Sequence, residues 1–447
     1  MSKLWSDKNK LHPLIEKFTI GNDAVIDLKL AKWDVLGSLA HSKMLTEVGI
    51  VTEKEFGLLS AELHSILELI EVGEFSIDEG IEDIHSQVEM MLISWIGDIG
   101  KKIHTSRSRN DQVLLDLRLY MRDEIKNTSY LIKELFESFI LLSEKNKLYL
   151  MPGYTHLQIA MPSSFGLWFA SFAESLADDL LLLETAYRMV NKNPLGSAAG
   201  YGSSFPIKRE ITTELLGFES LNYNSMYAQA SRVKVEMAVA NAFSSIASTM
   251  SRFAADACLF MSQNFGFIKL PKEFTTGSSI MPHKNNPDVF ELLRAKCNEI
   301  KTHSLQLLSF PNNLTTGYFR DYQLLKEPLF KAFDNMKQIL EISILVIPQL
   351  IIKENIMELS LYDVSFSVEE VEQRVKNGES FRSAYMTVSD QINNGEYKKQ
   401  AKVDYSHEGS LGNLCNNEIS KLFENTFDKF QFLKVEKAMD QLIQIGF

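Results

Sequence analysis

Three stretches of the chain contain neither glycine nor proline, and their apolar residues recur at helical spacing. The stretches cover residues 101–151, 167–193 and 226–265. In the first, Val113, Leu117 and Met121 fall on one face of a helix, because each is four residues from the next. A forty-residue helix is about 60 Å long at a rise of about 1.5 Å per residue, which exceeds the reach of one small domain. The pattern predicts an all-α fold in which long helices pack as a bundle.

The third stretch has a composition suited to close helix packing. It reads "SMYAQASRVKVEMAVANAFSSIASTMSRFAADACLFMS" and is rich in alanine, serine and methionine, which are small or adaptable side chains. We therefore expect it at the centre of a bundle that is shared between subunits. The pattern predicts an N-terminal helical domain at residues 1–106, a long-helix bundle at 107–355 and a smaller C-terminal helical domain at 356–447.

Composition and charge exclude several classes of protein. The chain has 447 residues, 45% of them hydrophobic, and a formal net charge of -12. A negative net charge disfavours nucleic acid and membrane surfaces as partners, because both are polyanionic. The cysteines, Cys258, Cys297 and Cys415, are odd in number and lack metal-ligand spacing, which favours a reducing compartment. With no apolar signal region at the start, the sequence predicts a cytoplasmic protein without a membrane span.

Polar, turn-forming stretches interrupt the predicted helices, and loops on a rigid scaffold are where functional groups gather. They cover residues 82–89, 104–113, 152–166, 275–288 and 315–328. In "TTGSSIMPHKNNPD", Gly277 and two serines offer free backbone N–H groups and Lys284 adds a positive charge, a combination suited to a carboxylate. The other stretches have ordinary alternatives: His156 could be a structural loop histidine, and "SRSRND" could be a helix cap with solvated arginines.

Three of these stretches carry a family resemblance. "GSSIMPHKNNP" is similar to the signature GSSxMPxKxNP of the fumarase/aspartase superfamily, whose members release fumarate from a substituted succinate. "HTSRSRNDQV" and "GYTHLQ" resemble the argininosuccinate lyases specifically, and the similarity runs over about residues 20 to 420. The resemblance implies a homotetramer with a central helical bundle, in which three subunits build each active site.

The resemblance also implies roles for individual residues. Ser278 matches the catalytic base, and His156 matches the catalytic histidine, which suits protonation of the leaving guanidine. Glu291 matches the glutamate that pairs with that histidine, while Lys284 and Asn286 match positions that hold the substrate carboxylate. The remaining substrate-binding positions are matched by Arg109, Asn110, Thr155, Tyr318, Gln323 and Lys326.

The implied reaction is the reversible cleavage of argininosuccinate to arginine and fumarate, the last step of arginine biosynthesis. No metal or organic cofactor is expected, because Lys284 and the loop N–H groups can stabilise the charge that develops on the carboxylate. The chain departs from the family pattern at Ser106, which replaces a glycine, at "GSAAGYG", and at "FTIGND", which lacks the usual substrate-binding serine. Another fumarate-releasing lyase and a catalytically silent relative therefore remain alternative interpretations.

Overall fold

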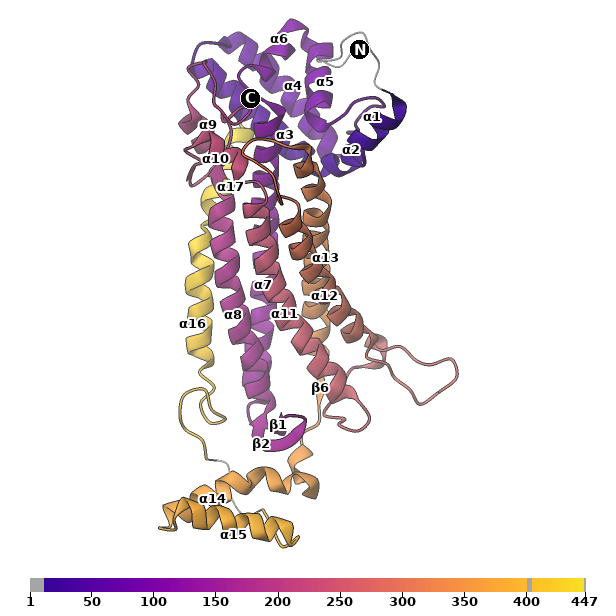
Figure 1. Cartoon of the computed structure of the whole chain (residues 1–447), viewed down its shortest axis with the longest axis vertical. Helices are drawn as coiled ribbons and strands as arrows, with labels where there is room; N and C mark the ends of the chain where they lie inside the picture. Colours follow the sequence, from indigo (N-terminus) through magenta and orange to yellow (C-terminus); the bar gives the residue numbers. More distant parts are fainter. Residues whose placement is uncertain (1–11, 400–403, 446–447) are drawn as a thin grey trace.

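A bundle of long helices dominates the structure, a computed structural model that describes residues 12–399 and 404–445 (Figure 1). Five long helices form the bundle: α7 (Arg109–Asn146), α8 (Phe165–Val190), α11 (Lys234–Met261), α12 (Asp288–Ser309) and α13 (Lys326–Val346). The predicted all-α fold is confirmed. None of the helices in the described residues is long and apolar enough to cross a membrane.

Helix α7 is the longest element, and its sequence explains where it begins. The Ser108 hydroxyl accepts the N–H of Asn110, and the Asp111 carboxylate accepts the N–H of Ser108 at 2.9 Å, so the first turn is capped from both sides. The helix then continues for 38 residues without a breaker, a length of about 57 Å. It ends earlier than the stretch free of glycine and proline predicted, because the chain turns into a short β-hairpin.

That hairpin, which the sequence reading did not predict, joins α7 to α8 at the lower end of the bundle in Figure 1. Strand β1 (Leu150–Thr155) pairs antiparallel with β2 (Gln158–Ser164). The two turn residues, His156 and Leu157, have left-handed backbones with φ of 54° and 58°. Two-residue hairpin turns need this conformation, which Asn-Gly usually supplies. His156 therefore sits at the tip of the hairpin, where it is exposed.

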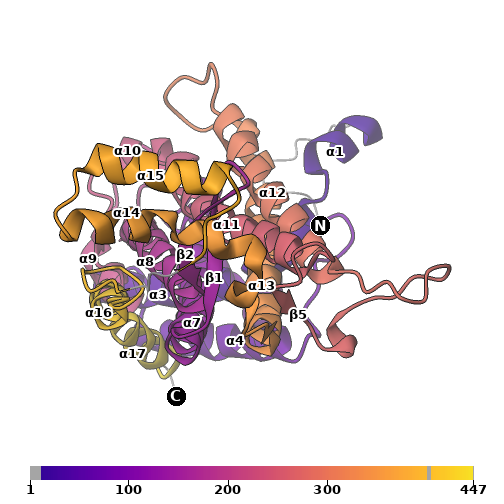
Figure 2. The ribbon, with the colours of Figure 1, turned by 90° about the horizontal axis from the view of Figure 1, so that it is seen from below.

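Shorter elements cover the two ends of the bundle. At the upper end lie α1 (Pro13–Ile20), α2 (Asp23–Ile26), α3 (Ala31–Glu47), α4 (Glu53–Glu71), α5 (Ile84–Ile96), α6 (Asp98–Lys101), α9 (Arg209–Leu215), α10 (Ser225–Ala230) and α17 (Phe432–Ile443). At the lower end, α14 (Ser367–Lys376) and α15 (Phe381–Asn393) lie across the bundle (Figure 2). Helix α16 (Asn416–Phe427) packs along α8 and leads back to the upper end. The division into three domains stays a prediction.

Small pieces of regular structure connect these helices. Two-residue strands form a parallel pair, β3 (Lys192–Asn193) with β4 (Ser220–Leu221), and an antiparallel pair, β5 (Ile268–Lys269) with β6 (Ile351–Ile352). Short 3-10 helices cover Asp27–Leu30, Lys102–His104, Lys272–Phe274, Arg320–Leu325, Ile347–Gln349, Ile356–Glu358, Ser360–Phe366 and Asp428–Phe430. The piece at Arg320–Leu325, η4, leads directly into α13 and carries one of the predicted site residues.

Aromatic side chains hold the bundle helices together. Trp168 of α8 stacks on Phe253 of α11 at a centroid distance of 5.1 Å, and Phe139 of α7 meets the same ring edge-on at 5.3 Å. The Trp168 indole N–H donates to Asp256 at 3.1 Å, which satisfies its polar atom. Near the hairpin, the close approach of α7 and α8 leaves no room for a side chain at Gly166, whose carbonyl accepts the Ser143 hydroxyl at 2.8 Å.

We expect Gly166→Ala to destabilise the protein by about 2–3 kcal/mol, because the new methyl group would lie 2.6 Å from the backbone of Lys147. Gly57→Ala is the matched control. This second glycine is also helical and has nothing within 4 Å of the added atom, so its replacement should leave stability unchanged or raise it by up to about 1 kcal/mol. Thermal unfolding at equal protein concentration measures both changes, and equal melting temperatures for the two variants would contradict the packing argument.

Candidate active site

The predicted site residues lie on three separate parts of the chain. One group surrounds the start of α7 and η4 at the upper end of the bundle and consists of Arg109, Asn110, Tyr318, Gln323 and Lys326. Thr155 and His156 lie on the hairpin beyond the other end of α7. Ser278, Lys284 and Asn286 lie on the 275–287 loop, and Glu291 follows that loop in α12. Because α7 is about 57 Å long, the upper group and His156 cannot meet within one chain.

Arg109 is held at the first turn of α7 by residues from the "EDIHSQVE" stretch. Its guanidinium donates to the Ser86 hydroxyl at 2.7 Å and lies 3.1 Å from the Asp83 carboxylate and 3.4 Å from that of Glu82. Arg320 of η4 pairs with the same Glu82, which links the two halves of the upper group. Burial opposes ionisation of Asp83, but the charges of His85 and Arg109 lower its pKa. Asp83 therefore stays ionised beside the arginine.

Lys326 is buried at the start of α13, where two carboxylates surround it. Its Nζ atom lies 2.5 Å from Asp27 and 2.8 Å from Asp23. Burial raises the pKa of Asp23 to about 6, against the opposing charge of Lys326. Sequence reasoning assigned no role to Asp23 and missed Asp27. Their spacing of four residues is compatible with one side of a helix, but it does not indicate the pairing with Lys326.

Gln323 and Tyr318, two further members of the upper group, contact other segments of the chain. The Gln323 amide donates to the carbonyl groups of Thr19 at 2.9 Å and Ile20 at 3.2 Å, so it fixes the end of α1. The Tyr318 ring lies 5.7 Å from the guanidinium of Arg232, a buried residue that also faces the ring of Tyr322 at 5.2 Å. Arg232 was also missed, because no motif in the sequence marks it.

Two of the departures from the family pattern contact each other next to this group. Ser106, in place of a glycine, has a left-handed backbone with φ of 64°, which explains why glycine suits this position. Its hydroxyl bonds that of Ser203, directly after "GSAAGYG", at 2.6 Å. The Asp111 carboxylate accepts the N–H groups of Gly196 and Ala198, so α7 and this loop are joined at two points. The serine therefore ties together two segments that both differ from the family pattern.

The 275–287 loop projects from the bundle between α11 and α12 (Figures 1 and 2). The Asn286 N–H donates to the Thr276 carbonyl at 2.8 Å and closes the base of the loop. Within it, the Ser278 hydroxyl oxygen accepts the N–H groups of Met281 at 3.1 Å and Ile280 at 3.3 Å. Lys284 is exposed. Within one chain, the Ser278 oxygen is therefore contacted by two backbone N–H groups of its own loop.

Glu291 follows the loop in the first turn of α12, and it is exposed. In the described part of the chain, no hydrogen bond or ion pair joins it to His156. The pairing of these two residues therefore stays a prediction. Within one chain, the residues of the upper group lie close together. The hairpin and the 275–287 loop, which carry other predicted site residues, lie apart from that group.

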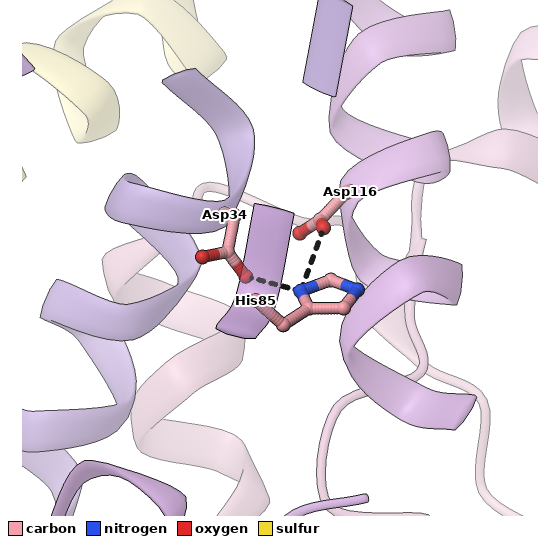
Figure 3. A group of neighbouring side chains, drawn as sticks. All are labelled: Asp34, His85 and Asp116. Atoms are coloured by element: carbon pink, nitrogen blue, oxygen red, sulfur yellow. Dashed lines mark hydrogen bonds and ion pairs between the residues drawn. The ribbon is translucent and has the colours of Figure 1, made fainter. Parts of the chain in front are cut away.

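A buried cluster of Asp34, His85 and Asp116 joins α3, α5 and α7 (Figure 3). The atoms that could coordinate a metal ion, one from each residue, all lie within 4.8 Å of one another, so the cluster could in principle hold a metal ion. The His85 Nδ1 atom, however, already lies 2.7 Å from an Asp34 oxygen, so the geometry is that of an ion pair. Burial by itself would lower the pKa of His85, but the two carboxylates outweigh it and raise the pKa to about 9. The imidazole is therefore charged at neutral pH.

Comparison with known proteins decides the family. A family model described as "Lyase" matches residues 5–301. The argininosuccinate lyase of Bacteroides thetaiotaomicron is 53% identical over 441 residues, which cover 99% of each chain. That of Thermotoga neapolitana is 40% identical over 388 residues, which cover 87% of this chain and 98% of the relative. The chain belongs to the argininosuccinate lyase family. The identification made from the motifs is confirmed, and as a member of this family the chain is an enzyme of the lyase class.

A more distant similarity shows that the fold extends beyond the argininosuccinate lyases. The crystal structure of EDDS lyase in complex with formate superimposes with a TM-score of 0.75 at 22% identity, over 98% of this chain and 95% of the other. At that identity the likeness concerns the fold alone. The long-helix bundle is thus a fold that this chain shares with EDDS lyase.

The raised pKa of His85 predicts a loss of stability in alkaline solution. The unfolded value is 6.5 and the folded value about 9, so the ion pair contributes fully below pH 6.5 and its contribution is lost as the pH rises through 9. The difference corresponds to about 3 kcal/mol. We expect the melting temperature to fall more steeply above about pH 7 in the wild type than in His85→Gln, measured at fixed protein concentration. If the melting temperature fell equally steeply with pH in both proteins, the stabilising role of this ion pair would be contradicted.

Proposed function

We propose that this chain catalyses the reversible cleavage of argininosuccinate to arginine and fumarate, the last step of arginine biosynthesis. The observation that carries the proposal is the match over 99% of both chains to a protein named argininosuccinate lyase. The chain also has serine, lysine and histidine at the motif positions where this chemistry needs a base, a carboxylate-binding cation and an acid.

Ser278 is the base in the proposed mechanism and removes a proton from the carbon next to a substrate carboxylate. A serine hydroxyl is a weak base, so its alkoxide must be stabilised. The two backbone N–H groups that point at the Ser278 oxygen favour the charged form, and Lys284 adds a positive charge in the same loop. Lys284 and Asn286 also stabilise the negative charge that builds up on the substrate carboxylate.

His156 is the acid in the proposed mechanism and protonates the guanidine nitrogen as the carbon–nitrogen bond breaks. An imidazole is suited to this role because its ordinary pKa lies close to neutral pH. Glu291 would orient the ring and favour its protonated form. The hairpin tip carries His156 on a turn with two left-handed residues, a conformation with little freedom to rearrange, so the ring is presented on a rigid support.

The upper group is proposed to bind the rest of the substrate. Argininosuccinate carries carboxylates, an ammonium group and a guanidinium group, so its site must offer both signs of charge. Arg109 and Lys326 supply cations, while Asp23 and Asp27 supply anions within the same group. Asn110, Thr155, Tyr318 and Gln323 complete the set of proposed substrate contacts. Such a site would reject malate and adenylosuccinate, because either would leave buried polar groups unpaired.

We further propose that the chain forms a homotetramer in which each active site combines parts of three subunits. The length of α7 supports this, since it separates His156 from the upper group by about 57 Å within one chain. One subunit would supply the upper group, a second the hairpin and a third the 275–287 loop. The helices of the bundle would supply the contacts between subunits, because long helices pack side by side.

The proposal includes no cofactor and places the enzyme in the cytoplasm. Lys284 and the loop N–H groups can supply the electrostatic stabilisation for which other enzymes use a metal ion. The three cysteines in the described residues are free thiols, two of them partly exposed, which is compatible with a reducing compartment.

The reaction can be tested by the ultraviolet absorbance of fumarate after argininosuccinate is added. We expect release by the wild type, and a loss of turnover of about 1,000-fold or more in Ser278→Ala, because the base is gone while no core contact changes. Fumarate release from malate or adenylosuccinate instead would indicate another lyase of the superfamily. A folded protein that acts on none of the three substrates would be a catalytically silent relative.

If active sites are shared between subunits, two inactive variants should restore catalytic activity when they are mixed. Ser278→Ala and His156→Asn should each be inactive, but refolding them together should produce some sites in which the intact serine and histidine come from different chains. We expect a regain of up to about a quarter of wild-type turnover and a tetramer in sedimentation. A monomer, or a mixture no more active than its parents, would refute the shared site.

A further inference from the structure

His85 joins three helices at the upper end of the bundle (Figure 3). It lies in the first turn of α5, Asp34 belongs to α3 and Asp116 to α7. The His85 Nδ1 atom is 2.7 Å from the Asp34 carboxylate and 3.7 Å from that of Asp116. All three side chains are buried, and one oxygen of each aspartate has no hydrogen-bond partner. His85 is thus the main cation available to both carboxylates.

The turn that His85 occupies is the one that holds Arg109. Asp83 caps α5 by accepting the Ser86 N–H at 2.9 Å, and both residues contact the Arg109 guanidinium. His85 lies between them in the sequence, and its ring points toward Asp34 and Asp116 in the buried cluster (Figure 3). A shift of the His85 ring would therefore shift both groups that fix Arg109.

Helix α7 closes this set of contacts. Asp116 follows Arg109 by seven residues, two helical turns, so both lie on the same face of α7. The contact between His85 and Asp116 fixes α5 against α7 directly below the point where Ser86 and Asp83 reach Arg109. Without the imidazole, Asp34 and Asp116 would lose the cation that lies within 4 Å of both and would keep the more distant attraction of the buried Arg107, which would weaken the contact between these helices.

We propose that His85 is a positioning residue for substrate binding, which acts by pairing with Asp34 and Asp116 and thereby holding Arg109 in place for a substrate carboxylate. The inference rests on the proposed function, because Arg109 matters only if the substrate carries that carboxylate. His85 does not itself touch the substrate, since it is buried below the arginine.

The test compares His85→Gln with His64→Gln. His64 is also a buried helical histidine, and its ring nitrogens lie within hydrogen-bond distance of the backbone carbonyl groups of Ser60 and Ile443. Both variants should lose thermal stability. We expect KM for argininosuccinate to rise about tenfold in His85→Gln with kcat changed by less than about threefold, and KM to stay unchanged in His64→Gln. Equal KM values in the two variants would overturn the proposal.

A second pair of variants tests the route through Arg109. In an Arg109→Ala background, His85→Gln should raise KM by less than about twofold, because the group it positions is already gone. A full tenfold rise in that background would show that His85 acts by another route and would overturn the proposal.

Hydrogen exchange separates this inference from the proposed function. We expect the amides of residues 84–90 to exchange about tenfold faster in His85→Gln than in the wild type, and to be unaffected in His64→Gln. This measurement needs no substrate, so it decides whether His85 fixes the turn even if argininosuccinate is not cleaved. Unchanged exchange would refute the positioning role, as would a stoichiometric metal ion in the purified wild type that is absent from His85→Gln.

Discussion

The rigidity and length of α7 constrain everything else in this molecule. A helix of 38 residues cannot bend back on itself, so the residues at its two ends stay about 57 Å apart. Arg109 begins the helix, and the hairpin with His156 follows its end. Any reaction that needs both residues must therefore bring in a second chain. This geometry supports the proposed sharing of sites between chains, and the number of four subunits comes from the family resemblance.

Charge pairing governs the upper end of the bundle. Lys326, Arg109 and His85 are each paired with carboxylates, and most of these groups are buried. Burying ions costs free energy unless their partners are well placed, so the helices that carry them must keep their positions. The same pairing leaves an arrangement of both charge signs, which suits a substrate with carboxylate, ammonium and guanidinium groups. In the proposed function, substrate recognition therefore uses the same contacts that stabilise this end of the bundle.

Much of the candidate site could be predicted from the sequence because the motifs are local, and the roles of its residues stay predictions. "GSSIMPHKNNP" and "GYTHLQ" identified the family, and the loop and the hairpin that carry them are each formed by neighbouring residues. Asp27 and His85 were missed for a different reason. Each acquires its meaning from a partner far along the chain, Lys326 for Asp27 and Asp34 for His85, and no spacing in the sequence shows such a pair.

The sequence by itself determined the helical fold and the family, because helical periodicity and the absence of glycine and proline act over a few turns, and the motifs lie within single loops. Tertiary structure decided that the chain reverses through a β-hairpin, that Ser106 bonds Ser203, and that His85 sits between two aspartates. Tertiary structure also decided which of the predicted site residues lie close together within one chain. The distance between two such residues depends on how far the rigid helices extend, and their separation in sequence does not reveal it.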